Sequence, residues 1–144
     1  TADGGKPALG LSRDLITPVL ATSGGIGYSF RLPSPGEWEA TCRAGATTSF
    51  SWGEARDDAT VSTHAVVAET AAGVSGPRVV GTKSANAFGF YDMHGNVWEM
   101  TSDGDIRGGS WRDSLPSARC ANMVAVDRIV EHPLVGIRLV LELK

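Results

Sequence analysis

The sequence predicts a single α+β domain with short strands, few helices and a large share of irregular loop. Its 144 residues are enough for one hydrophobic core and too few for two. Alternating apolar and polar residues predict strands at 28–32 and 135–141, and shorter strands are expected at 78–81 and 119–122. The 18 glycines favour turns over helices in the chain between these strands.

One helix is predicted between Ser34 and Gly45. Ser34 and Glu37 have the spacing of a capping box, in which each side chain bonds the other residue's backbone N–H. Gly45 can take the left-handed conformation that often ends a helix. Trp38 and Cys42 share one face of this helix by their spacing, and we expect that face to be buried. The chain from 46 to 77 is assigned mainly to loop, and 1–27 to a trimmed or extended N-terminal arm.

The stretch from Asn86 to Trp111 is expected to organise the rest of the domain. It holds two of the four tryptophans, and apolar residues stand on both sides of a tight turn at Gly95. Asp92 and Glu99 flank that turn, and such a loop can direct several oxygens toward a hard cation such as calcium. The alternative is that Asp92 caps a turn and Glu99 pairs with an arginine, and both interpretations are open.

Composition gives limits on function. The formal charge of −3, without a basic cluster, gives no reason to propose nucleic acid as a partner. No apolar run is long enough for membrane insertion. The chain begins at Thr1 without a signal peptide, which suggests a trimmed or processed chain. Cys42 and Cys120 could form one bridge, but a pair of small buried thiols is favoured.

Six ordered sequence blocks resemble the formylglycine-generating-enzyme (sulfatase-modifying-factor) family. Their number, order and spacing make the match more specific than one short motif. The blocks are Arg31–Ser34 with Glu37–Glu39, Cys42–Gly45, Ser51–Gly53, Asn86–Glu99, Arg107–Trp111 and Gly136–Arg138. The resemblance implies a variant of the C-type lectin fold over the single domain 1–144.

The resemblance also implies what the chain lacks and what it keeps. Enzymes of this family oxidise a substrate cysteine with two cysteines shortly after the Gly-Gly-Ser-aromatic block, and the sequence at 112–118 contains no thiol. We therefore expect no catalytic residues and no enzyme activity. A structural calcium site of the family maps onto the side chains of Asp92 and Glu99 and the main-chain oxygens of Gly95 and Val97. His94 is expected to be a turn residue.

The segment 112–134 resembles the variable proteins of diversity-generating retroelements, which also have the C-type lectin fold. In those proteins the randomised side chains cluster on one exposed face. The resemblance implies a ligand-binding set of Arg112, Asp113, Ser114, Ser117, Met123, Val124, Asp127, Val130, His132 and Leu134. The alternative for the apolar members is that they are ordinary core residues under a loop.

These observations predict a receptor-recognition domain whose partner is a macromolecule, in particular a protein on a cell surface. The resemblance places such a chain on a virion or a cell surface, and the oligomeric state is left open. A mixture of arginine, acidic, histidine and apolar side chains on a rigid platform suits protein recognition, where a few anchors dominate binding. Two alternatives are an oxidase of the formylglycine-generating group and an accessory domain that binds no separate ligand.

Overall fold

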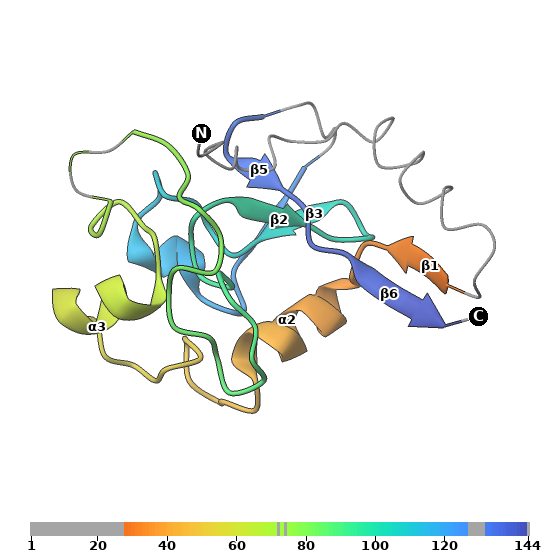
Figure 1. Ribbon diagram of the computed structural model, residues 1–144, viewed down its shortest axis with the longest axis horizontal. Coiled ribbons are helices and arrows are strands. Elements are labelled where there is room, and N and C mark those ends of the chain that lie inside the picture. The colour runs from red at the N-terminus through yellow and green to blue at the C-terminus, as the bar shows by residue number, and fades with distance from the viewer. Residues whose placement is uncertain (1–27, 72, 74, 127–131, 144) are drawn as a thin grey trace, which may run out of the picture.

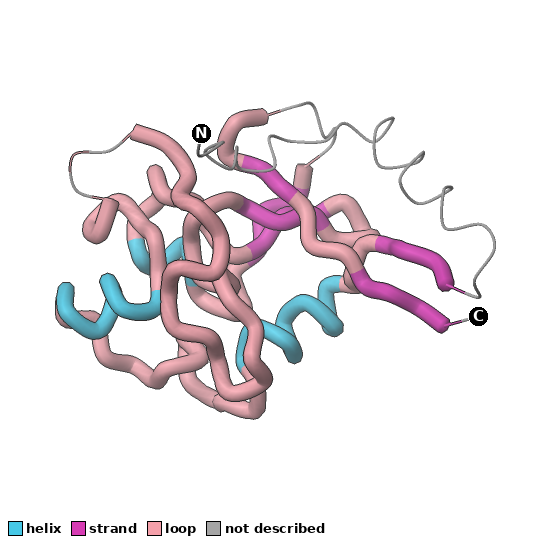
Figure 2. The backbone as a smooth tube through the Cα atoms, viewed as in Figure 1, coloured by secondary structure: helices cyan, strands magenta, loops and turns pink. Residues whose placement is uncertain are grey.

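The computed structural model describes residues 28–71, 73, 75–126 and 132–143 (Figure 1). It has the mixed α and β architecture with few helices and short strands that the sequence predicts. Most of the chain between its helices and its central strands is loop (Figure 2). None of the described helices is both long enough and apolar enough to cross a lipid bilayer. The elements, in chain order, are β1 (Tyr28–Arg31), α2 (Pro35–Arg43), α3 (Asp58–His64), β2 (Trp98–Met100), β3 (Asp105–Arg107), η1 (Leu115–Ala118), β4 (Met123–Ala125), β5 (Val135–Gly136) and β6 (Val140–Leu143).

The described strands form two small sheets. One pairs β1 with β6 in antiparallel fashion, so it joins the first and last described strands of the chain. The other has the order β4-β3-β2-β5, with β2 antiparallel to β3 and parallel to β5. Strand β4 therefore forms one edge of this sheet, and it pairs with β3 alone.

Helix α2 begins with the capping box that the sequence predicts. The Ser34 side chain accepts a hydrogen bond from the Glu37 N–H, and the Glu37 carboxylate accepts one from the Ser34 N–H. Arg31 donates two hydrogen bonds to the same carboxylate, and these bonds lower the pKa of Glu37 to about 2. The helix ends one residue earlier than predicted, because Ala44 rather than Gly45 is the first residue in the left-handed region, with φ of 48°.

Three clusters of buried side chains form the core. The first surrounds Phe50, and Trp52 stacks on that ring with centroids 4.7 Å apart. The second is built on Trp98, Met100 and Ile106 of the larger sheet. The third lies under α2, where the predicted buried face contributes Trp38 and Cys42, and these pack with Met93 and Cys120. Full burial of Trp38, 1% exposed, confirms its assignment to the core.

Several predicted strands differ from the structure for identifiable reasons. Residues 78–81 form no strand, because the Arg78 N–H and carbonyl both bond the side chain of Asn96 instead of a neighbouring strand. The prediction at 119–122 is displaced, and β4 begins at Met123. The segment 135–141 is divided between β5 and β6 in different sheets, with Arg138 in the break. Phe88 and Phe90, two of the apolar residues that precede the Gly95 turn, lie in an exposed loop.

Helix α3 is an element that the sequence interpretation missed. Four of its seven residues are threonine, valine or serine, which have modest helix propensity. Only Val61 is buried among its side chains, so it has no apolar stripe to indicate a helix. The signal that could have found it is Asp57, whose carboxylate caps the helix by accepting from the Thr60 N–H.

Candidate functional site

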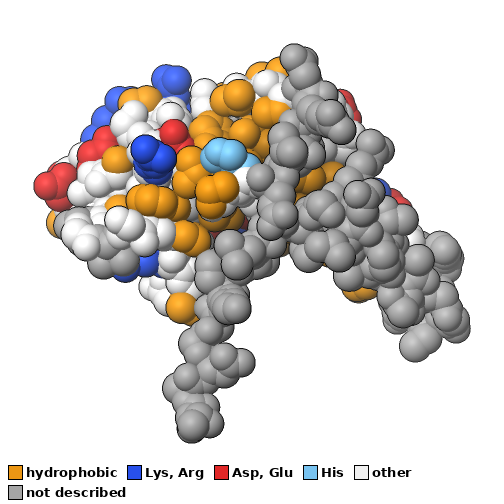
Figure 3. Space-filling model, turned by 90° about the horizontal axis from the view of Figure 1, so that it is seen from above, with side chains coloured by type: hydrophobic (Ala, Val, Ile, Leu, Met, Phe, Trp, Pro, Cys, Tyr) orange, Lys and Arg blue, Asp and Glu red, His pale blue; other side chains and the backbone are white. Residues whose placement is uncertain are grey.

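The structure divides the predicted recognition segment 112–134 into exposed and inward-facing residues. Met123 and Val124 lie on the edge strand β4 and are 47% and 42% exposed. Arg112, Ser114 and His132 are exposed on the flanking turns. Ser117 is half-buried on η1, and Asp127 and Val130 lie outside the described residues. Seen from above, the molecule shows hydrophobic side chains gathered around a histidine, with basic side chains nearby (Figure 3).

Asp113 and Leu134 are half-buried, and their side chains contact the core. The Asp113 carboxylate accepts hydrogen bonds from the Trp98 indole N–H at 2.8 Å and from the Ser110 N–H at 3.1 Å. The Asp113 main-chain oxygen accepts a further bond from the Ala68 N–H. Leu134 packs against the Trp98 cluster. These two residues attach the segment to the core, so they are not exposed ligand-binding residues.

Trp98 is the residue on which separate pieces of the segment meet. Its side chain donates to Asp113, and its N–H donates to the Leu134 carbonyl at 2.7 Å. Val126, at the end of β4, packs against the same buried cluster as Leu134. The turn at 112–114 and the loop at 132–134 are therefore hydrogen-bonded to one buried tryptophan, and the residue that follows the edge strand packs against the cluster that contains it. We call the predicted ligand-binding residues that are exposed on these three pieces the recognition face: Arg112, Ser114, Met123, Val124 and His132.

The Glu99 carboxylate, a predicted calcium ligand, has hydrogen-bond donors on both of its oxygens. Glu99 is buried, and its Oε2 accepts from the Trp38 indole at 2.7 Å and from Arg138 Nε at 2.9 Å. Its Oε1 accepts from Arg138 Nη2 at 2.8 Å. Burial alone would lower the pKa of Arg138, but the charge of Glu99, with a smaller contribution from Asp92, raises it. A guanidinium thus supplies the positive charge near both predicted carboxylates.

The second predicted side-chain ligand of calcium, Asp92, bonds the backbone of a neighbouring loop. Asp92 accepts a hydrogen bond from the Gly81 N–H at 2.6 Å, which caps a neighbouring loop. Gly95 is buried and donates to the Gly108 carbonyl at 2.7 Å, and Val97 is half-buried. These contacts are those of the alternative interpretation, a turn cap and an arginine pair. The Glu99 carboxylate, with both oxygens bonded to Arg138, does not fit a calcium ligand.

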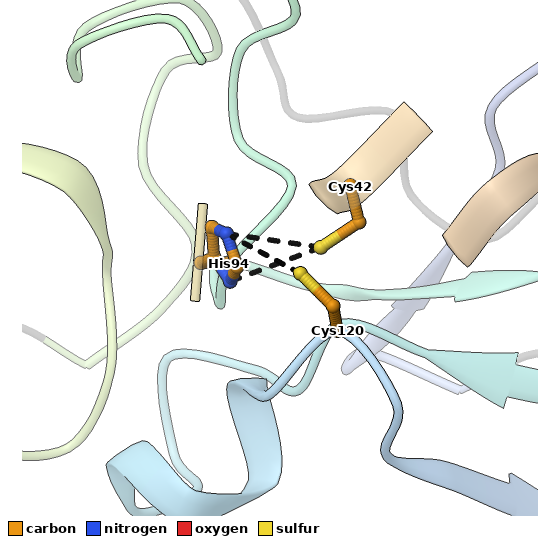
Figure 4. Close-up of side chains that lie close together, drawn as sticks. All are labelled: Cys42, His94 and Cys120. Carbon is orange, nitrogen blue, oxygen red and sulfur yellow. Dashed lines mark hydrogen bonds between the residues drawn. The ribbon is translucent and has the colours of Figure 1, made fainter. Parts of the chain in front are cut away.

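A third group of side chains was not predicted as a unit. Cys42 of α2, His94 of the central turn and Cys120 before β4 converge in the core (Figure 4). One ligand-capable atom of each lies within 4.8 Å of the others. Both cysteines are free thiols and fully buried, which agrees with the preferred interpretation of the pair.

The ring of His94 is oriented by its hydrogen bonds. Nδ1 lies 2.7 Å from the Ala118 carbonyl, so it carries the proton and donates. Nε2 is then the acceptor nitrogen, and it lies 3.7 Å from Cys42 Sγ and 4.0 Å from Cys120 Sγ. Burial raises the pKa of Cys42, whereas the hydrogen bond from Cys42 and then the contact with His94 lower the pKa of Cys120 to about 6.

Sequence reasoning missed this group because its three members are 26 to 78 residues apart in sequence, which no short motif can reveal. The assignment of His94 to a turn located its backbone correctly. That assignment did not anticipate a side chain only 3% exposed. The one available signal was composition: with only two cysteines and three histidines in the chain, few combinations of soft ligands had to be considered.

Comparison with known proteins agrees with the sequence blocks. Residues 8–143 match the sulfatase-modifying factor enzyme 1-like domain. The chain belongs to this family. Formylglycine-generating enzyme of Mycobacterium tuberculosis is 36% identical to it over 83 residues, an alignment that covers 50% of this chain. That alignment covers only 26% of the relative's own length.

Solved structures support the fold of this sulfatase-modifying factor-like domain. PvdO from Pseudomonas aeruginosa has a TM-score of 0.79 at 25% identity and aligns with 93% of this chain and 61% of its own. Treponema denticola variable protein 1 has a TM-score of 0.66 at 24% identity, covering 77% of this chain and 47% of its own. CarF has a TM-score of 0.61 at 22% identity, over 81% and 48% of the two chains. At these identities the last two comparisons show a shared fold alone.

Proposed function

We propose that this domain is a non-enzymatic recognition module that binds a macromolecular ligand, of the kind built by variable proteins of diversity-generating retroelements. The observation that supports it best is the attachment of three separate chain pieces to Trp98 or to the buried cluster around it. Their inward residues, Asp113 and Leu134, are fixed by hydrogen bonds and packing. Their other side chains point to solvent. Such a division lets the outer residues vary without disturbing the core.

The chemistry of the recognition face suits a protein ligand. Met123 and Val124 offer apolar area on an exposed strand edge, and Arg112 offers a charged, planar anchor. Methionine is unbranched and adapts to irregular partner surfaces. In the described part of the chain β4 is an edge strand, and an edge strand can bind an extended segment of a partner through main-chain hydrogen bonds. A protein on a cell or virion surface is the partner class that we propose.

Cysteine oxidation of the formylglycine-generating type is the second candidate, because the relative from Mycobacterium tuberculosis carries that name. The described thiols do not suit it. Cys42 and Cys120 are each 0% exposed, so a peptide thiol could not reach either sulfur while the domain is folded. The sequence at 112–118 offers no other thiol. We therefore favour recognition over oxidation.

The experiment is a binding screen of the 144-residue chain against an array of purified secreted and cell-surface proteins. Each hit is then measured with a face variant that combines Arg112→Ala, Met123→Ser and Val124→Ser. A control variant carries Val79→Ser and Val80→Ser, which change two valines that are exposed outside the recognition face. We expect at least one hit whose affinity falls by about tenfold or more in the face variant and stays unchanged in the control.

Two results would overturn the proposal. One is a screen in which no hit is weakened by the face variant. The other is oxidation of a cysteine-containing peptide by the purified chain in the presence of copper and oxygen, at a rate that the face variant leaves unchanged. The melting temperature of each variant is measured in parallel, and equal melting temperatures separate loss of binding from loss of folding.

A further inference from the structure

We propose that Cys42, His94 and Cys120 form a buried binding site for a thiophilic d10 cation, either Zn2+ or Cu+. The recognition function makes no use of these side chains. They come from three elements far apart in sequence, and Figure 4 shows the imidazole facing both sulfur atoms. Two thiolates and one imidazole are the ligands that such ions prefer, and no carboxylate belongs to the group.

The distances fit an ion at the centre of the group. A zinc–nitrogen bond is about 2.0 Å and a zinc–sulfur bond about 2.3 Å, so at ligand angles of about 110–120° the nitrogen and sulfur lie about 3.5–3.7 Å apart. Nε2 of His94 lies 3.7 Å from Cys42 Sγ and 4.0 Å from Cys120 Sγ. The chosen ligand atoms all lie within 4.8 Å of one another. Two sulfurs on one ion would lie about 4 Å apart, so side-chain shifts of less than about 1 Å would bring all three ligands onto one ion.

The bond on the far side of the imidazole is the one that a metal ligand needs. Metal-bound histidines nearly always donate their second ring N–H to a carboxylate, a carbonyl or water, which fixes the tautomer and the ring orientation. His94 Nδ1 donates to the Ala118 carbonyl at 2.7 Å, so its Nε2 lone pair is directed into the group. Because Ala118 is only two residues before Cys120, the same short segment supplies both the ring's support and one sulfur ligand.

Ser51 is the competing partner of that lone pair. Its hydroxyl lies 3.0 Å from Nε2 and its N–H lies 3.3 Å away. The hydroxyl can rotate to another acceptor, and the N–H contact is long for a hydrogen bond. Both contacts would be given up when an ion binds. Each thiol would release its proton to solvent at the same time, so binding consumes no oxidant or reductant.

The number of ligands separates the two ions. Three protein ligands complete a trigonal site for Cu+, whereas a structural Zn2+ site usually has four. Zn2+ would therefore need one added ligand, such as water, in a space where Cys42, His94 and Cys120 are almost fully buried. In either case the ion would tie α2, the central turn and the segment before β4 together.

The test uses the full 144-residue chain, reduced and stripped of metal with a chelator under nitrogen. It is titrated separately with Zn2+, with Cu+, and with Co2+ as a spectroscopic probe. We expect one equivalent of Zn2+ or Cu+ per chain, protection of both thiols from alkylation, and a thiolate-to-cobalt charge-transfer band. Cys42→Ala and Cys120→Ala should each abolish stoichiometric binding. Met93→Leu is the matched control, because Met93 packs in the same buried cluster and should leave binding unchanged.

The wild-type chain decides the question even if a cysteine variant fails to fold. Retention of no metal at equimolar concentration, by chain whose two thiols are reduced, would overturn the proposal. Binding that survives in Cys42→Ala or Cys120→Ala would also overturn it, since the ion would then lie elsewhere. A chain that isolates with a Cys42–Cys120 disulfide, and whose reduced form takes up no ion, would assign the pair to covalent bridging instead.

Discussion

Replacement of Arg138 by methionine should destabilise the domain strongly, because it removes the cation that compensates Glu99. The Glu99 side chain is 9% exposed and accepts two hydrogen bonds from Arg138, at 2.8 and 2.9 Å. Loss of one partner from a buried ion pair costs about 3–5 kcal/mol. Since the Arg138 side chain is itself 26% exposed, we expect the lower end, about 3 kcal/mol. For a chain of this size that corresponds to a fall in melting temperature of roughly 6–12 °C.

A double-mutant cycle measures whether this loss comes from the pair. Glu99→Gln keeps an oxygen for the Trp38 indole N–H, which donates to this carboxylate at 2.7 Å. The combination of Glu99→Gln with Arg138→Met leaves no buried charge without a partner. It should therefore be less destabilising than the sum of the two single changes. Thermal and urea unfolding of the four proteins supply the values.

A calcium ion bound to Glu99 would give the opposite result for Arg138→Met. If Glu99 were a calcium ligand, then Ca2+ would raise the melting temperature of the wild type, a chelator would lower it, and Arg138→Met would have little effect. For chain already stripped of zinc and copper, the contacts of Glu99 with Arg138 predict the reverse: no response to calcium or to a calcium chelator, and a large response to the loss of the guanidinium. A calcium-dependent melting temperature together with a neutral Arg138→Met variant would refute the reasoning.

Three further predictions follow from single contacts. Asp113→Ala should lower the free energy of unfolding by about 1–3 kcal/mol, because it leaves the Trp98 indole N–H and the Ser110 N–H without an acceptor. Replacement of its exposed neighbour, Arg112→Ala, should change that free energy by less than about 0.5 kcal/mol. Equal losses in the two variants, measured by urea unfolding, would contradict this. Gly95→Ala should prevent folding, since a Cβ there would lie 2.1 Å from a backbone oxygen. Gly81→Ala is also at positive φ but has open space around it, so it should fold at a cost of about 1–2 kcal/mol. Circular dichroism distinguishes the two variants, and a folded Gly95→Ala would count against the structure. Glu37 has a pKa of about 2 in the folded chain, below its ordinary 4.5. Its contribution to folding stability is therefore fully present above pH 4.5 and is lost as the pH falls through 2. A carboxyl NMR titration with a midpoint near 4.5 would contradict the capping and ion-pair contacts.

Local signals in the sequence predicted the helix at α2, the turn at Gly95 and the burial of Trp38. Each depends on residues within a few positions of one another, so the pattern contains the physical cause. The capping box at Ser34 is of this kind, and its predicted bonds are present. The family assignment is likewise confirmed, because its blocks are short local patterns in a fixed order.

Long-range contacts are what the sequence could not supply. Nothing near Arg138 indicated that it would meet Glu99, 39 residues away, and interrupt a predicted continuous strand. Asp113 looked like an exposed acidic residue beside Arg112 until its bond to the Trp98 indole placed it inward. His94 likewise met both cysteines only through the fold. In each case a polar side chain was satisfied by a partner that local pattern does not reveal.

The central claim is that a fixed core presents a face whose residues can change freely, and two display libraries test it most directly. The first randomises the recognition face, Arg112, Ser114, Met123, Val124 and His132; the second randomises the inward residues of the same segment, Asp113 and Leu134. Resistance of displayed chains to protease is measured against the wild type. We predict that most members of the first library stay folded and most of the second do not. Widespread loss of folding in the first library, or equal tolerance in both, would contradict the account.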